Sequence, residues 1–589
     1  MPSIESHENV LILSELWTIA MHHPDDPQLP SLGIFASMAA LIQKAIKSPS
    51  WLLHDQNIYI PYYAAHVIGS YTMNKPEFAE QAVESGVIPP LLDLLGGKIS
   101  WVEQRVAVRA LGHLASYQAT FEAVAVYERE VVELAMELAC SAADVVYKEF
   151  VGVKDGALRL KYHCDLLTRG VGGSEMEERK AEEWAGQVQC WSLYLLNCFA
   201  SKERSITLIC SRVGFLERLS KMWGGVANHS SPAGIGLIRI LCYYKAGRKK
   251  IAESEQVIRS LCNISRSSDD WQYMGIDCLV LLLRDRETRY RVMELASLCL
   301  VDLVEVKNLG HYRSNVGETV AEALLLDYKL QWKVQQLKGN ERVEKRLEEV
   351  WSLKVGRRKK ERTMSKERLE ERKVLAMLIK QQAKRFFVVG EVEEAMAKYG
   401  EALETCPLRF RKERMCLYGD RAECRWVVGD VDGAISDSTR AISLSSTADG
   451  NRSLWRRAKG YEMKGMAKEC LMDCIMYVSG CVKMERRRGV GVIPYDAVHL
   501  MSKMMDATWL FAAAKSAKAD ELLVKDDENG ELEEIVMRMV METKGDISLS
   551  GDVGEGLSTI VEEEPSGKEY LSRRKLARPR TGKKKPQSL

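Results

Sequence analysis

Apolar residues along most of the chain recur at the i, i+3, i+4, i+7 spacing of amphipathic helices, and the alternation typical of half-buried strands is rare. The most regular example is a pair of stripes: Ile88, Leu91, Leu92 and Leu95, then, after two glycines, Ala107, Ala110, Leu111 and Leu114. Two amphipathic helices joined by a glycine turn cannot cover their own apolar faces. We therefore predict an all-α fold in which such units stack on one another.

Related phrases recur later in the first half of the chain. Val213-Gly214-Phe215-Leu216 predicts the start of a second such helix, with Leu219 and Trp223 in register, and Gln256-Val257-Ile258 predicts a third. The separation from Leu216 to Ile258 is 42 residues, and that from Ile88 to Leu216 is 128, close to three such periods. A period of ~40 to 47 residues is typical of armadillo and HEAT solenoids.

Residues 84–92 (Glu-Ser-Gly-Val-Ile-Pro-Pro-Leu-Leu), followed by residues 105–115, resemble an armadillo repeat, in which a glycine turn leads into the second helix and an alanine-rich third helix follows. The resemblance implies an armadillo/HEAT-like α-solenoid over residues 1–335 that offers a concave surface to extended peptides. Gly170 to Gly173 interrupt the pattern and predict a loop. The tryptophans fall at irregular intervals, which favours core positions over a recognition ladder: Trp101, Trp184, Trp191, Trp223 and Trp271.

Residues 374–525 carry a second repeat pattern with a shorter period. Its landmarks resemble a tetratricopeptide repeat (TPR): Ala383, Phe386, Gly390, Ala395, Tyr399, Ala402 and Pro407. Three units align through Gly390, Gly429 and Gly465, at spacings of 39 and 36 residues, which implies short insertions in a 34-residue repeat. A final apolar stripe predicts a capping helix: Leu500, Met504, Ala507 and Phe511.

This second segment resembles the three-repeat TPR domains of co-chaperones, which hold the acidic C-terminal peptide of heat-shock chaperones in a two-carboxylate clamp. The positions that match the clamp are Lys380, Lys384, Asp420, Arg452 and Arg456. Cationic and amide donors are the groups that satisfy paired carboxylates. Lys384 and Asp420 replace asparagines of the family, and Arg452 replaces a lysine. Asp420 is expected to repel an acidic ligand unless Lys384 neutralises it.

A charged segment, residues 336–373, separates the two repeat regions and is expected to form a helical connector. Residues 354–373 carry ten basic and four acidic side chains, including Arg357, Arg358, Lys359 and Lys360. A solvated connector is favoured, and a nuclear-localisation patch and a contact with RNA phosphates remain open. Residues 526–589 contain too little apolar surface for a core, so we expect a disordered tail, whose basic run Arg573-Arg574-Lys575 is a second localisation candidate.

Composition narrows the function classes. The 84 basic and 82 acidic residues nearly cancel, so a dedicated nucleic-acid binder is not favoured. The fifteen cysteines include no Cys-x-x-Cys spacing, and we expect no metal site and no cofactor. The first residues lack the basic and apolar pattern of a secretion signal, and no apolar stretch is long enough for a membrane span. We therefore expect a protein of the cytoplasm, the nucleus or both.

The sequence contains no Gly-x-x-x-x-Gly-Lys-Ser/Thr loop, no Gly-x-Ser-x-Gly elbow and no His-Glu-x-x-His motif, so an enzyme is not favoured. The leading hypothesis is a non-catalytic scaffold for protein–protein interaction, a co-chaperone-like adaptor whose TPR groove binds an acidic C-terminal peptide such as a heat-shock chaperone tail. The alternative hypothesis is a nuclear or RNA-associated adaptor that uses the basic connector and tail.

Overall fold

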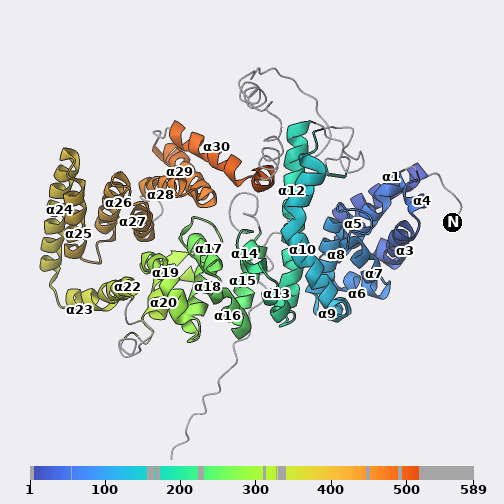
Figure 1. The fold of residues 1–589 in the computed structure, drawn as a ribbon, viewed down its shortest axis with the longest axis horizontal. Coiled ribbons are helices and arrows are strands. Elements are labelled where there is room, and N and C mark those ends of the chain that lie inside the picture. The colour runs from blue at the N-terminus through green and yellow to red at the C-terminus, as the bar shows by residue number, and fades with distance from the viewer. Residues whose placement is uncertain are drawn as a thin grey trace, which may run out of the picture.

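The computed structural model of the protein describes residues 6–54, 56–73, 75–154, 166–167, 173–222, 231–309, 313–326, 328, 340–445, 451–488 and 494–516. Within these ranges the chain is α-helical apart from one short antiparallel pair, β1 (Asn308–Leu309) with β2 (Arg313–Ser314). The helices stack into two consecutive solenoids, which confirms the predicted fold class (Figure 1). The predicted tail at 526–589, with Arg573, Arg574 and Lys575, lies outside the described residues, as does Trp223.

The first solenoid begins at Ser6. Its helices up to residue 151 are α1 (Ser6–His22), α2 (Gln28–Ser31), α3 (Ile34–Lys47), α4 (Pro49–Leu52), η1 (Asn57–Tyr59), α5 (Ile60–Thr72), α6 (Pro76–Glu84), α7 (Ile88–Leu95), α8 (Gln104–Ser116), α9 (Gln118–Ala125), α10 (Glu128–Val146) and the π-helical turn η2 (Tyr147–Val151). The later ones are α12 (Ser174–Ala200), α13 (Ile206–Ser211), α14 (Phe215–Leu219), α15 (Ala233–Tyr243), α16 (Lys245–Glu253), α17 (Glu255–Arg266), α18 (Gln272–Arg284), α19 (Arg289–Leu303) and α20 (Val316–Leu324).

The predicted helix pair at residues 88–114 is confirmed as α7 and α8, with the expected break at Gly96 and Gly97. Helices α5, α8, α12, α15 and α18 pack one on the next, and this row is the spine of the first solenoid. Trp184 and Trp191 of α12 are buried, as a core role requires. The predicted helix at Phe215 begins as expected but ends at Leu219, and its stripe is therefore shorter than the sequence suggested.

The segment between the solenoids is packed in its first part, whereas residues 357–362 have no buried side chain, as a solvated connector requires. It contains α22 (Glu341–Trp351), the π-helical turn η3 (Ser352–Gly356) and α23 (Arg357–Arg362). Val343, Leu347 and Val350 of α22 are buried in the same apolar core as α19. The sequence suggested a solvated connector because its charges are dense. However, α22 places its charges on one side and its apolar residues on the other, so one side packs against the first solenoid.

The second solenoid consists of three helix pairs and a final helix: α24 (Lys366–Val389) with α25 (Val392–Thr405), α26 (Arg411–Val427) with α27 (Val431–Leu444), α28 (Asn451–Met463) with α29 (Ala467–Arg488), and α30 (Tyr495–Thr508). Gly390, Gly429 and Gly465 stand at the three turns with φ of 94°, 79° and 67°. This left-handed backbone costs glycine nothing, whereas a side chain would be strained there. The three predicted turn glycines are thus confirmed.

The end of the described chain returns to the first solenoid. Leu500 and Met504 of α30 cover the last helix pair, as predicted for a capping helix. Phe511, which the sequence placed in the same stripe, lies instead in the apolar core of the first solenoid, with its ring 6.1 Å from that of Tyr147. The Leu510 amide donates to a carboxylate oxygen of Glu182 on α12 at 2.9 Å. The two solenoids therefore touch both at their chain connection and at this far end.

Candidate peptide-binding face and the junction between the solenoids

The first helices of the three pairs, α24, α26 and α28, share a charged face. Lys380 of α24 forms an ion pair of 2.9 Å with Asp420 of α26. This pairing differs from the sequence expectation, in which Lys384 neutralises Asp420. Lys384 lies one turn further along α24 and is exposed, and it is Lys380 that the packing of α24 against α26 brings to Asp420.

Arg456 of α28 approaches the same part of α26 from the other side. It forms an ion pair with Glu423, and a Cβ atom on Gly419 would lie 3.2 Å from its Nη1. The short residue at position 419 therefore leaves room for the guanidinium. Lys380 and Arg456, two of the predicted clamp residues, flank residues 419–423 of α26 from opposite sides.

Two predicted clamp cations have no acidic partner among the described residues. Lys384 is exposed on α24, and Arg452 is exposed one turn before Arg456 on α28. Arg452 lies near Tyr477 of α29. Burial raises the pKa of the Tyr477 phenol, and the charge of Arg452 acts in the opposite direction. These two side chains are free to bind an anion, whereas Lys380 and Arg456 are already neutralised.

Sequence reasoning missed two further features of this face. Lys459 of α28 places its Nζ 5.2 Å from the ring centroids of both Trp426 and Trp455, a cation–π arrangement. Glu423 was also missed. The spacing of residues 452, 456 and 459 at i, i+4, i+7 on one helix, and of 420 and 423 on another, could have revealed both. We call the set Lys380, Lys384, Asp420, Glu423, Arg452, Arg456 and Lys459 the α24/α26/α28 face.

The two acidic residues of α26, Asp420 and Glu423, act on the pKa of the buried Tyr399. Burial is the main cause that raises the pKa of Tyr399, and the charge of Asp420 adds to it, while Arg456 opposes it. The phenol therefore stays protonated at neutral pH. Tyr399 is a packing residue and does not contribute charge to the face.

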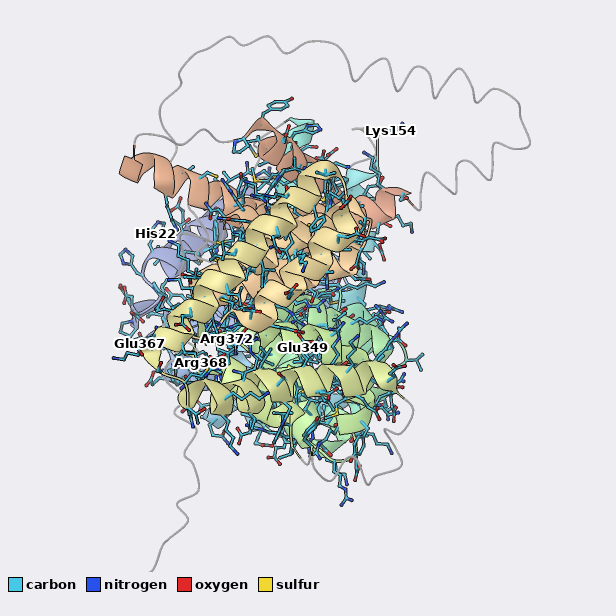
Figure 2. All side chains as sticks on the ribbon, turned by 90° about the vertical axis from the view of Figure 1, so that its left-hand side faces the viewer. His22, Lys154, Glu349, Glu367, Arg368 and Arg372 are labelled. Atoms are coloured by element: carbon cyan, nitrogen blue, oxygen red, sulfur yellow. The ribbon has the colours of Figure 1, made fainter. Side chains whose placement is uncertain are left out.

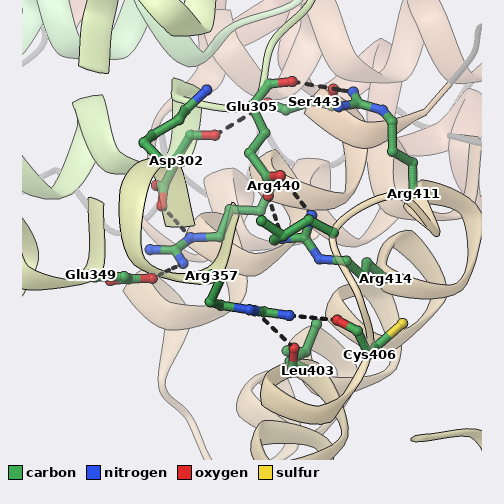
Figure 3. A network of polar contacts seen from close by, with 12 residues as sticks. Asp302, Glu305, Glu349, Arg357, Leu403, Cys406, Arg411, Arg414, Arg440 and Ser443 are labelled. Atoms are coloured by element: carbon green, nitrogen blue, oxygen red, sulfur yellow. Dashed lines mark hydrogen bonds and ion pairs between the residues drawn. The ribbon is translucent and has the colours of Figure 1, made fainter. Parts of the chain in front are cut away.

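A network of buried charges holds the second solenoid against the first (Figure 3). Asp302 at the end of α19 is fully buried and accepts hydrogen bonds from Arg440 at 2.8 Å and Ser436 at 2.6 Å, both on α27. On its own solenoid, Arg266 donates to Asp302 at 2.6 Å. Arg440 also pairs with Glu349 of α22. Buried charges are tolerated only when they are paired in this way.

Further arginines of the second solenoid also bond across the junction. Arg414 of α26 is buried and forms a bidentate pair with Glu305, at 2.6 and 2.5 Å. Burial alone raises the pKa of the Glu305 carboxyl, but Arg414, Arg411 and Lys354 outweigh it and hold the pKa below its usual value. Arg457 of α28 pairs with Asp473, and both contact Ser268 of the first solenoid.

The four cations of the predicted basic patch on the connector fall into two kinds, according to whether they are bonded to other elements. Arg357 donates to the carbonyl oxygens of Leu403 and Cys406 at the end of α25, so it serves as a C-terminal cap (Figure 3). Arg358 pairs with Glu318 of α20 at 2.6 Å. Lys359 and Lys360 are exposed and have no acidic partner among the described residues. Two of the four cations are thus structural.

The described residues contain no group of three or more His, Cys, Asp or Glu side chains placed to hold a metal ion. None of the described helices combines the length and the apolar character that a bilayer crossing needs.

Comparison with known proteins agrees with the helical-repeat character of the first 211 residues, which are part of the first solenoid. The family described as Plant ARM repeat matches residues 1–211. Protein unc-45 homolog B of Danio rerio is 28% identical over 107 residues, which cover 18% of this chain and 11% of that protein. The mitochondrial import receptor subunit TOM70 is 30% identical over 98 residues in Rattus norvegicus and in Homo sapiens, covering 17% of this chain and 16% of the receptor subunit. The chain thus matches less than a fifth of the length of these relatives.

Among solved structures, an engineered protein covers 86% of this chain at 16% identity with a TM-score of 0.37. The described residues define a helical-repeat protein, and the armadillo match extends over its first 211 residues. Solenoids of this kind present extended concave surfaces.

Proposed function

We propose that the protein is an adaptor whose α24/α26/α28 face binds an acidic peptide segment of a partner protein while the first solenoid contacts a second protein. The observation that carries the proposal is the charge of this face. Lys384, Arg452 and Lys459 have no acidic partner there, and the two acids, Asp420 and Glu423, are already paired with Lys380 and Arg456. The net charge of the face is therefore positive.

The resemblance of residues 374–525 to co-chaperone TPR domains supports a peptide with a free C-terminal carboxylate, such as a heat-shock chaperone tail. A different acidic segment is also compatible with the altered clamp. Asp420 occupies a position that is an amide in that family, so the ligand need not place a carboxylate at this position. An α-carboxylate next to an acidic side chain would meet Arg452 and Lys384 first, since these cations are unpaired. We place this activity in the cytoplasm, the nucleus or both.

The rigid junction gives the adaptor a fixed geometry. Asp302, Glu305 and Ser268 of the first solenoid are all bonded to the second, so these contacts set the orientation of the α24/α26/α28 face relative to the first solenoid. A partner on each surface would be held at a defined separation, which raises the effective concentration of one for the other.

An array of C-terminal peptides tests this proposal. We expect the wild-type chain to retain peptides with acidic ends and to release them when the end is amidated or the acids are replaced by lysine. Arg456→Glu should abolish retention, because it places a negative charge beside Glu423 and Asp420. Lys249→Glu, an exposed change on the first solenoid, is the control and should bind as wild type. Equal retention by the Arg456→Glu chain would refute the proposal.

A further inference from the structure

The two ends of the second solenoid differ in whether a further helix caps them. At one end α30 covers the last helix pair, and Leu500 and Met504 are buried beneath it. At the other end α24 has its outer side open, with Val374, Leu375 and Leu378 being 58%, 50% and 51% exposed. In Figure 1 α24 lies at the outer edge of the molecule, and in Figure 2 it runs along the front. Terminal helices of a solenoid normally present a polar outer side, so this open apolar side is unusual.

The open side of α24 carries one continuous stripe, which we call the α24 stripe: Glu371, Leu375, Leu378, Gln382, Arg385 and Val389. The intervals alternate between four and three residues, which is the spacing of a helix that packs along a second helix. The stripe is separate from the other surfaces of α24. Ala376, Ile379 and Ala383 face the core, and Lys380 belongs to the α24/α26/α28 face.

The charges of the stripe are arranged symmetrically. Glu371 and Arg385 lie seven residues before and seven residues after Leu378, two helical turns in each direction. Both are exposed, and neither has an ion-pair partner among the described residues. When two copies of such a helix pack antiparallel with Leu378 at the centre, Glu371 of each copy faces Arg385 of the partner subunit. A two-fold contact of this kind requires a self-complementary surface, and the charges of the α24 stripe meet this requirement.

We propose that a second copy of this chain binds the α24 stripe through an antiparallel contact between the two α24 helices, centred on Leu378. Leu375 and Leu378 supply apolar contact at the centre, and two Glu371–Arg385 pairs fix the direction and the register. Because one helix from each copy forms the contact, it is smaller than a standard interface, and we expect a Kd on the order of tens of micromolar.

Sedimentation velocity on the full chain from ~1 to ~200 µM, a range that brackets this Kd, tests the proposal. The wild type should shift from monomer to dimer across the range. Leu378→Glu should stay monomeric, because it buries two like charges at the centre of the contact. Val126→Glu, at a position that is 77% exposed on the first solenoid, is the matched control and should dimerise as wild type.

Charge reversal separates this contact from any other way of dimerising. Glu371→Arg alone and Arg385→Glu alone should each be monomeric, since like charges then meet at both ends. An equimolar mixture of the two variants should form a one-to-one dimer, because every charge again faces its opposite. A wild type that stays monomeric at all concentrations would overturn the proposal in favour of another occupant, such as residues 517–589 or a different protein. Dimerisation of both single variants at wild-type strength would overturn the proposal as well.

Discussion

Asp302 of α19 accepts a 2.8 Å hydrogen bond from Nε of Arg440 in α27, although 138 residues separate them. Both side chains are buried, and Asp302 is bonded at the same time to Arg266 and Ser436. This carboxylate is therefore shared by the two solenoids. Its position makes the orientation of the second solenoid a property of the fold.

Removing the shared charge should destabilise the whole chain. Asp302→Asn leaves the guanidinium groups of Arg266 and Arg440 buried without full compensation, which costs about 3–5 kcal/mol for a pair broken in this way. Urea unfolding followed by circular dichroism should show an earlier transition than wild type. Asp432→Asn, at an exposed position on α27, should leave the midpoint nearly unchanged. An unshifted midpoint for Asp302→Asn would contradict the assigned role.

The Glu305–Arg414 pair should make stability depend on pH. The pKa of Glu305 is lower in the folded state than in the unfolded chain, so its contribution is complete above the unfolded value, about 4.3. The contribution is lost as the pH falls below that value and through the folded pKa. Glu305→Gln should therefore lower the unfolding free energy by about 1.5–3 kcal/mol at pH 7. The difference from wild type should shrink progressively below about pH 4. A difference that stays constant from pH 7 to pH 3 would argue against the pair.

Phe511 should contribute to the stability of the first solenoid even though it follows the second one in the chain. Its ring is fully buried against Tyr147 and Trp509, so Phe511→Ala should cost about 3–5 kcal/mol. Tyr495→Ala, at an exposed position on α30, is the control, and we expect it to stay within about 0.5 kcal/mol of wild type. Thermal denaturation of both variants checks this. Equal stabilities would mean that residues 509–511 do not dock on α12.

Asp420 should weaken the binding of acidic peptides. Asp420→Asn frees Lys380 and removes one negative charge from the α24/α26/α28 face, so the affinity for an acidic peptide should rise roughly 3- to 10-fold at low salt. The gain should decrease as salt is added, since the site is partly exposed. Fluorescence anisotropy with a labelled peptide measures both effects. A loss of affinity in this variant would mean that Asp420 contacts the ligand directly.

The sequence predicts the local features of this fold well. The stripes at residues 88–114 and the glycines 390, 429 and 465 each depend on neighbours in the chain, and the structure places them as expected. The junction could not be predicted, because nothing near Asp302 indicates that its partner is Arg440. The sequence also could not predict that Lys380, and not Lys384, is the partner of Asp420. The register between α24 and α26 decides this, and it is set by packing between neighbouring helix pairs.

Calorimetric titration of an acidic peptide with a free carboxylate into wild type and into the double variant Lys384→Glu with Arg452→Glu shows whether the α24/α26/α28 face binds the peptide. Both positions are exposed and without acidic partners in the described chain, so the substitutions leave the fold intact, which circular dichroism verifies. We predict saturable binding to wild type, weakened by salt, and no detectable binding to the double variant. Binding of equal affinity to both chains would contradict the assignment of this face as the peptide-binding site.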